Sequence, residues 1–321
     1  MKSAIMVKRF NLNRLLSERT MLVYFSLILF IIVAGIVKPV SLGLDNLKSV
    51  IQAASILGIV SLGQGIVMLS GGMDISIGNL MFFIIVYGGH FLSRYPEYFV
   101  GLCVLCLLVG ALVGLINGIG VSKFKISPII MTLATSSILY GLIYIFGGGR
   151  LGSAAPETLQ QIGQGVFLGI VPYSVIIWII LAIFFTFLLS KTTFGRRIYA
   201  TGNNPDAAFL SGIKVEGILV KSYIICDVLA ALAGLIFLGY LGTPTLRFTD
   251  LYTMGSIEAC VLGGIDFYSG IGNIVGTIAG SFFVRFMFTF LLMLSVPEAG
   301  RMIVEGVLIL VIVAAYKLRE K

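Results

Sequence analysis

The chain has 321 residues, of which 58% are hydrophobic and only 11% are charged, and its mean hydropathy is +1.07. Soluble domains carry about 25% charged residues, which cover their apolar core with a polar shell. This composition excludes a soluble enzyme, a disordered protein and a nucleic-acid-binding protein, although 22 Lys and Arg outnumber 14 Asp and Glu. In a membrane protein the same excess is typical of cytoplasmic loops.

A membrane-spanning helix needs about 20 mostly apolar residues. The segment Tyr252–Ser269 is shorter and broken by glycines, so it either crosses as an interrupted helix or re-enters. We predict an all-α polytopic membrane protein with about ten transmembrane helices in two related halves, some of them interrupted, and with both termini cytoplasmic. The other predicted spans are Met21–Val37, Val50–Leu69, Ile77–Leu92, Phe99–Asn117, Pro128–Phe146, Pro172–Ser190, Ile218–Tyr240, Ile274–Leu294 and Arg301–Tyr316.

The loop charges orient the chain. With ten crossings and both ends inside, most of the 22 Lys and Arg fall on the cytoplasmic side, as the positive-inside rule requires. The predicted organisation is a cytoplasmic tail at 1–20, one transmembrane domain at 21–316 and a cytoplasmic tail at 317–321. Two loops are long: the outer loop 147–171 and the cytoplasmic loop 191–217.

The cytoplasmic loop contains a short predicted helix. Asn204 is a favourable N-cap, Pro205 fits the first helical position, and Asp206 complements the helix dipole. Gly212 is a favourable stop, and Phe209 is available to dock. Because a two-turn helix is unstable alone in water, it needs a partner surface. That surface is either another protein or the chain's own membrane domain.

Two glycine-rich segments repeat a Gly-Gly-x-Asp pattern followed by Gly-Asn. They are GQGIVMLSGGMDISIGN at 63–79 and LGGIDFYSGIGN at 262–273. The repeat suggests two related halves, each with a broken helix and an acidic residue at comparable positions, which is typical of a translocation path. A carboxylate at membrane depth is a candidate functional group, but capping of a following helix is the favoured interpretation of Asp74 and Asp266.

No catalytic or nucleotide-binding motif is present. The sequence contains no G-x-x-x-x-G-K-[ST], G-x-S-x-G or H-E-x-x-H, and His90 is its one histidine. We therefore expect no enzymatic activity, no metal site and no cofactor on this chain. If ATP drives the protein, a partner must bind it.

Four segments carry a resemblance to a known family. The chain resembles, from Leu47 to Tyr316, the permease subunits of bacterial ABC importers of the ribose/galactose/xylose type, in the branched-chain-permease superfamily. The segment at 192–213 is the most specific and resembles the family's cytoplasmic coupling segment, which docks on the ATPase. The segments are SGGMDISIGN (70–79), SPIIMTLAT (127–135), TTFGRRIYATGNNPDAAFLSGI (192–213) and IEACVLGG (257–264).

The resemblance implies two sets of functional residues. The sequence departs from the family after the second Gly-Gly, where an expected Gly-Arg-Gly is missing and Asp266 is added. The predicted coupling residues are Gly195, Arg196, Gly202, Asn203, Asn204, Pro205, Asp206, Ala207, Ala208, Phe209, Ser211 and Gly212. The candidates for the translocation path are Gly71, Gly72, Asp74, Ser76, Gly78, Gly263, Gly264 and Asp266.

The resemblance also implies an assembly in the lipid of the bacterial cytoplasmic (inner) membrane. This chain would pair with a second permease subunit, identical or a sister chain. A tandem-domain ATPase inside would hold ATP and Mg²⁺, and an extracytoplasmic solute-binding protein would deliver a neutral sugar; no nucleic acid takes part. The alternatives are a permease of the same architecture for a nucleoside, a signalling furanose or a branched-chain amino acid, and an ion-coupled secondary transporter that uses Asp74 or Asp266. Few charges lie in the outer loops, which favours a neutral solute.

Overall fold

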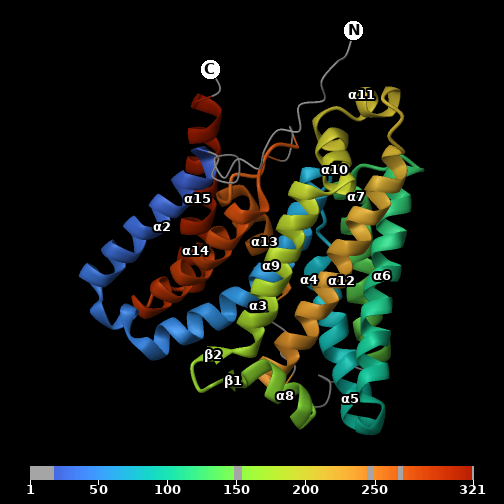
Figure 1. Ribbon diagram of the computed structural model, residues 1–321. Coiled ribbons are helices and arrows are strands. Elements are labelled where there is room, and N and C mark those ends of the chain that lie inside the picture. Colours follow the sequence, from blue (N-terminus) through green and yellow to red (C-terminus); the bar gives the residue numbers. More distant parts are fainter. Residues whose placement is uncertain (1–17, 148–153, 244–248, 267–269, 320–321) are drawn as a thin grey trace.

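The computed structural model describes residues 18–147, 154–243, 249–266 and 270–319, and it is built almost entirely of helices (Figure 1). A short antiparallel hairpin of β1 (Val166–Phe167) and β2 (Val171–Pro172) is the exception in the described part. The helices are α2 (Glu18–Val37), α3 (Leu44–Leu69), α4 (Ile77–Phe83), α5 (Gly89–Arg94), α6 (Phe99–Ser122), α7 (Pro128–Gly147), α8 (Glu157–Gln164), α9 (Tyr173–Lys191), α10 (Thr193–Asn203), α11 (Pro205–Leu210), α12 (Val215–Leu241), α13 (Thr249–Leu262), α14 (Ile274–Met293) and α15 (Glu298–Arg319), with 3₁₀ turns at Pro39–Leu42 and Pro96–Tyr98.

The long helices coincide with the predicted spans. Seven of them, α2, α3, α6, α7, α9, α12 and α14, are long and apolar enough to cross a membrane. The span predicted at Ile77–Leu92 is one helical run in which the π-helical turn Ile84–Gly88 joins α4 to α5. The all-α polytopic membrane fold is therefore confirmed, while ten crossings and cytoplasmic termini stay predictions.

The glycine-broken segment at Tyr252–Ser269 is helical only in its first part. Helix α13 ends at Leu262, and its 14 residues span about 21 Å at 1.5 Å per residue. A bilayer core is about 30 Å thick, so α13 alone is too short to cross it. Residues 267–269 lie outside the described part of the chain.

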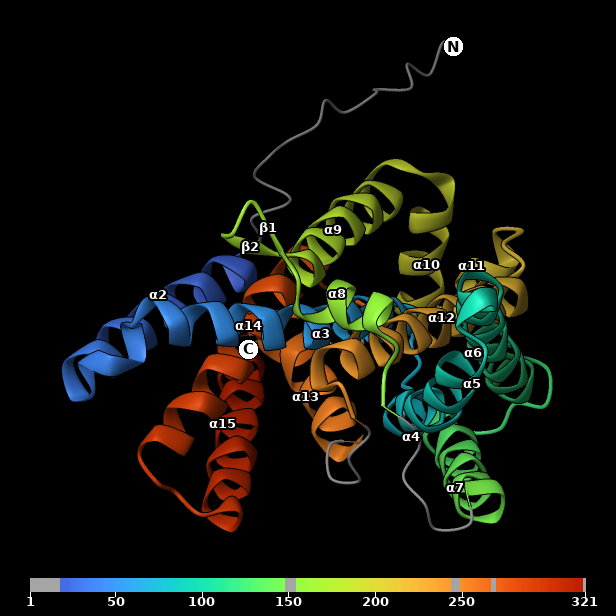
Figure 2. The same ribbon diagram turned by 90° about the horizontal axis from the view of Figure 1, so that it is seen from below.

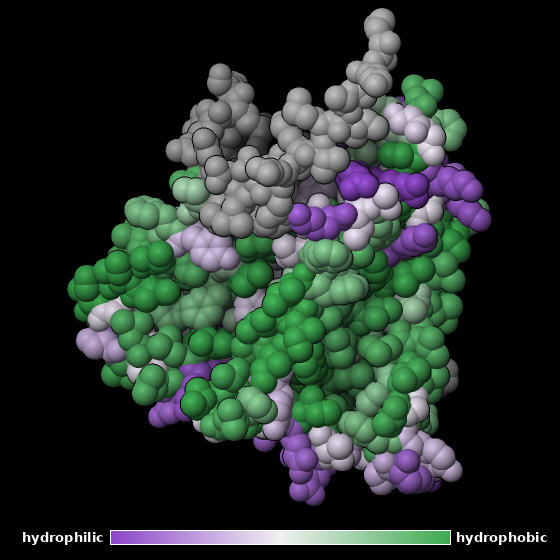
Figure 3. All heavy atoms as spheres, in the orientation of Figure 1, coloured by the Kyte–Doolittle hydropathy of each residue, from purple (hydrophilic) through white to green (hydrophobic). Residues whose placement is uncertain are grey.

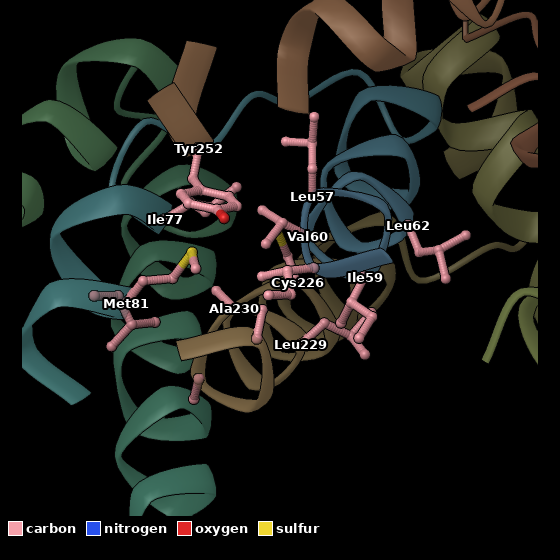
Figure 4. Packing of buried hydrophobic residues seen from close by; sticks show 14 of the residues in the cluster. Leu57, Ile59, Val60, Leu62, Ile77, Met81, Cys226, Leu229, Ala230 and Tyr252 are labelled. Atoms are coloured by element: carbon pink, nitrogen blue, oxygen red, sulfur yellow. The ribbon is translucent and has the colours of Figure 1, made fainter. Parts of the chain in front are cut away.

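Helix α3 forms the centre of the molecule (Figure 2). It is buried along most of its length and packs against α9, α12, α13 and α14. Figure 4 shows Val60 of α3 beside Cys226 of α12. The two backbones approach closely because Gly63 has no side chain: a Cβ atom there would lie 2.9 Å from the Cα atom of Cys226. Small residues allow this close packing where helices are surrounded by lipid.

The outer helices present their apolar side chains to the surroundings. Ile180 and Ile183 of α9 are 60% and 66% exposed. Figure 3 shows a broad hydrophobic belt with hydrophilic residues gathered toward the two ends of the molecule. Since lipid tails, unlike water, solvate such a belt without cost, this surface fits a chain embedded in a bilayer.

The two ends of the molecule differ. Helices α10 and α11 lie at the same end as the start of α2 and the end of α15, while α5, α8 and the β1–β2 hairpin lie at the opposite end (Figure 1). Sequence reasoning treated 147–171 as one long loop and did not predict α8 or the hairpin. The arrangement places the loop 191–217 on the side where the predicted topology puts both termini.

Candidate functional site

The short helix predicted in the cytoplasmic loop is present as α11 (Pro205–Leu210). The Oδ1 atom of Asn204 accepts a hydrogen bond from the backbone N–H of Ala207 at 2.9 Å, which is a side-chain N-cap. Gly212 follows the helix with φ of +79°, and the N–H of Ile213 donates to the carbonyl of Ala208. This left-handed glycine cap ends the helix where the sequence predicts its end.

The tip of α11 presents two large apolar side chains to its surroundings. Phe209 is 70% exposed and Leu210 is 85% exposed, whereas Ala208 beside them is 4% exposed and packs inward. Helix α11 contacts α10 and α12, so part of the surface that stabilises it is the chain's own domain. The exposed pair remains available for a second protein, and exposed apolar patches mark interaction sites.

Helix α10 (Thr193–Asn203) precedes α11 and was not predicted from the sequence. The Oγ1 atom of Thr192 accepts a hydrogen bond from the N–H of Gly195 at 3.3 Å and caps the helix. Gly195 and Gly202 argue against a helix by propensity, but tertiary packing overrides them because Ile198 is fully buried. The Thr192 cap is the sequence signal that could have identified this helix.

The predicted coupling residues divide by exposure. Gly195, Gly202 and Ala208 are buried, so they position the segment rather than present it. The exposed members are Arg196, Asn203, Asn204, Pro205, Asp206, Ala207, Phe209, Ser211 and Gly212.

Gly202 joins the coupling segment to both glycine-rich loops. A Cβ atom on Gly270 would lie 2.5 Å from the carbonyl carbon of Gly202 and 2.8 Å from the amide nitrogen of Asn203. On the other side, a Cβ atom on Gly71 would lie 3.6 Å from the Cα atom of Gly202, and Gly202 itself packs on the carbonyl of Leu69. Three motifs that are far apart in the sequence therefore meet at one backbone contact.

A hydrogen bond strengthens this junction. The Tyr199 hydroxyl of α10 donates to the carbonyl of Gly272 at 3.1 Å, just before α14 begins. Burial raises the pKa of Tyr199 to about 12, so the hydroxyl is protonated and able to donate at neutral pH. The bond therefore links α10 to the segment that leads into α14.

Asp74 belongs to a buried polar network. Its Oδ1 atom accepts hydrogen bonds from the backbone N–H of Ser76 at 2.8 Å and from the Ser76 hydroxyl at 2.6 Å. The Asn117 amide donates to Ser76 Oγ at 3.0 Å and to Asp227 Oδ2 at 3.3 Å, and the Thr135 hydroxyl donates to Asn117 Oδ1 at 2.6 Å. The network connects the start of α4 to α6, α7 and α12. Its geometry favours a structural role for Asp74, and a role in the translocation path stays a prediction.

Each glycine of the first motif, at positions 71, 72 and 78, has a specific backbone conformation or contact. Gly71 has φ of +86°, a conformation that side chains other than glycine rarely adopt. A Cβ atom on Gly72 would lie 2.6 Å from the hydroxyl of Tyr223. The N–H of Gly78 donates to the hydroxyl of Thr253 at 3.1 Å, which ties α4 to α13.

The two Gly-Gly-x-Asp motifs share a helix cap but differ in register. Gly71 ends α3 and Gly264 ends α13 with matching left-handed caps, at φ of +86° and +84°. In sequence, Gly71 is the first glycine of its pair and Gly264 is the second. Asp74 and Asp266 are therefore not at equivalent positions, which corrects the expectation drawn from the sequence.

The second motif packs against the start of α14. A Cβ atom on Gly263 would lie 2.6 Å from the carbonyl carbon of Gly276, so the two helices cross through their glycines. The N–H of Asp266 donates to the carbonyl of Ile271 at 2.8 Å and closes the loop between them. Asp266 is half-buried in this loop.

Comparison with known proteins agrees with this architecture. Residues 46–313 match the family described as branched-chain amino acid transport system / permease component. The chain is 32% identical over 299 residues to the autoinducer 2 import system permease protein LsrC of Escherichia coli (strain K12 / DH10B), covering 92% of this chain and 86% of the relative. It is 34% identical over 272 residues to LsrC of Salmonella paratyphi B, covering 84% and 77%. No solved structure matches the chain.

These matches confirm the resemblance drawn from the glycine-rich and coupling motifs. The family is a transport component, so the chain is not an enzyme, and its place in the bacterial cytoplasmic membrane agrees with its seven apolar helices. The chain belongs to the family of branched-chain amino acid transport system permease components.

Proposed function

We propose that this chain is the membrane-spanning subunit of an ATP-driven importer for a small neutral, sugar-like solute. The names of its relatives, which are permeases of an autoinducer 2 import system, support an import role. The family description adds branched-chain amino acids as a second solute class to be tested.

The observation that carries the proposal is the exposed tip of α11. Phe209 and Leu210 form an exposed apolar patch on the capped helix α11. Gly202 of the preceding helix α10 contacts the end of α3 and the loop before α14. A partner ATPase that bound this patch would move these elements when it closed on ATP. In an ion-coupled transporter the patch would have no partner protein.

The proposed assembly places each task on a different subunit. ATP and Mg²⁺ are bound by the ATPase, and this chain binds no cofactor. A second permease, identical or a sister, completes the membrane part, and an extracytoplasmic binding protein delivers the solute. Closure of the ATPase draws the coupling helices together and switches the opening of the path from one side to the other, a two-state change driven by nucleotide.

The test is isolation of the complex from the native host in mild detergent, followed by transport in proteoliposomes. We expect a tandem-domain ATPase to co-purify and ATP to drive uptake of ribose, galactose, xylose or autoinducer 2. ATP-driven uptake of leucine instead would show that the solute is a branched-chain amino acid rather than a sugar, and would leave the ATP-driven mechanism unchanged. Uptake driven by an ion gradient without an ATPase would contradict the proposal.

A further inference from the structure

A cleft between α3, α13, α14 and α15 contains five ionisable side chains. Its volume is about 430 Å³. Helix α13 contributes a carboxylate, α14 an arginine, and α15 both signs of charge. The residues that matter to the argument are Glu258, Arg285, Phe288, Glu298, Arg301 and Glu305.

The cleft reaches from the middle of the membrane domain toward the end opposite α10, which the predicted topology places outside. The bond from Tyr199 places the start of α14 beside α10, and the 20 residues of α14 extend about 30 Å away from that end. Arg285 lies near the middle of α14, and Arg301 lies in the first turns of the next helix. The deepest charged groups are largely shielded: Glu258 is 6% exposed and Arg285 is 8% exposed.

Aromatic rings hold the two arginines in place. The guanidinium carbon of Arg285 lies 4.7 Å from the ring centroid of Tyr252, and that of Arg301 lies 4.8 Å from the ring centroid of Phe288. Such cation–π contacts are strong where water is scarce. Among the described residues, the buried Nε atoms of both arginines have no hydrogen-bond partner. The rest of each guanidinium group belongs to a side chain that lines the cleft.

The chemistry of the cleft suits a solute with several hydroxyl groups. A hydroxyl both donates and accepts, so it can pair with carboxylates and with guanidinium groups at once. Donors and acceptors reach the cleft from three different helices, which fits several hydroxyls around a small ring. Charged side chains at membrane depth are costly, and they mark solute paths.

We propose that this cleft is the outer half of the solute path and holds a neutral, hydroxyl-rich solute through Glu258, Arg285 and Glu305. The assignment of the solute rests on the proposed import function, whereas the location of a water-filled path does not. Weak binding is sufficient here, because a strong site would slow release.

Cysteine labelling tests the path without any solute. Met254 lines the cleft, while Ile180 lies on the outward face of α9 and is 60% exposed in the isolated chain. In the full chain within its complex, we expect a membrane-impermeant maleimide added outside to label Met254→Cys well above the native background, and to leave Ile180→Cys at background. Equal, background labelling of both variants would overturn the path.

Uptake then tests the charged residues. With protein amounts in the membrane matched, we expect Glu258→Gln to lower ribose uptake roughly tenfold, because the carboxyl group that pairs with a solute hydroxyl is replaced. Glu97→Gln, at an exposed position between α5 and α6, is the matched control and keeps native uptake. Native uptake by Glu258→Gln would overturn the role of the cleft.

The two proposals fail in different ways. A native complex that moves leucine but not ribose would overturn the hydroxyl-rich solute. A complex that moves nothing with ATP would contradict the importer, while labelling of Met254→Cys would still decide whether the cleft is a water-filled path.

Discussion

Gly202 of α10 and Gly270 of the loop before α14 are in direct backbone contact: a Cβ atom on Gly270 would lie 2.5 Å from the carbonyl carbon of Gly202. Neither position has room for a side chain. The contact makes the coupling segment part of the membrane domain rather than an appended loop. We therefore expect a movement of α10 to be accompanied by a movement of the segment that leads into α14.

Substitution of Gly270 by Ala is expected to break this junction. Gly270 has φ of +58°, so alanine adds backbone strain of about 1–3 kcal/mol to the steric clash. We expect a lower melting temperature in detergent and a loss of ATP-driven uptake. Gly217→Ala is the control, because nothing lies within 4 Å of a Cβ atom there. Native melting and uptake in Gly270→Ala would show that the contact is dispensable.

Charging the tip of α11 is expected to separate the chain from its ATPase. The double substitution Phe209→Asp with Leu210→Asp removes two exposed apolar side chains and leaves the caps of the helix intact. Central interface residues contribute about 2 kcal/mol or more, roughly thirtyfold in affinity. We expect the ATPase to be lost from pull-downs while the permease stays in the membrane.

The control for charge alone is Leu168→Asp, at an 81% exposed position in the hairpin of the opposite end. It should retain the ATPase. If the α11 variant also retains the ATPase and transports normally, α11 is not the docking element.

Substitutions of Asp74 distinguish a cap from a charge that acts on the solute. Asp74→Asn keeps an oxygen that can accept from Ser76, since Asn caps nearly as well as Asp, so we expect little change in melting temperature. Asp74→Ala leaves the N–H and hydroxyl of Ser76 buried without an acceptor, which costs about 1–3 kcal/mol. Thermal unfolding in detergent measures both. Abolished uptake in Asp74→Asn at native stability would instead assign the carboxylate to the path.

Tyr199→Phe is expected to weaken the link between α10 and α14. It removes the 3.1 Å hydrogen bond to Gly272 and should cost about 1 kcal/mol of stability. Burial raises the pKa of Tyr199 from 10.0 to about 12, so the contribution of the bond is complete below pH 10 and is lost only as the pH rises through 12. The difference in melting temperature between native and variant protein should therefore be constant from pH 6 to 9. A difference that shrinks over this range would contradict the assignment.

Local chemistry determined much of this protein. Apolar runs of about 20 residues are sufficient for spanning helices because an isolated helix satisfies its own backbone in lipid. Asn204, Pro205 and Gly212 define α11 because caps act within a few residues. The sequence therefore predicted the membrane fold, the helix α11 and the family.

Contacts between distant segments decided the rest. Helix α10 forms although it contains two glycines, because the burial of Ile198 outweighs their low helix propensity. Asp74 and Asp266 are not at equivalent positions, because the left-handed cap uses the first glycine of one Gly-Gly pair and the second glycine of the other. The meeting of Gly202 with Gly270, and of Glu258 with Arg285 and Glu305 in one cleft, depends on how helices cross. Helix crossings are set by packing between side chains far apart in the chain, and no local pattern records them.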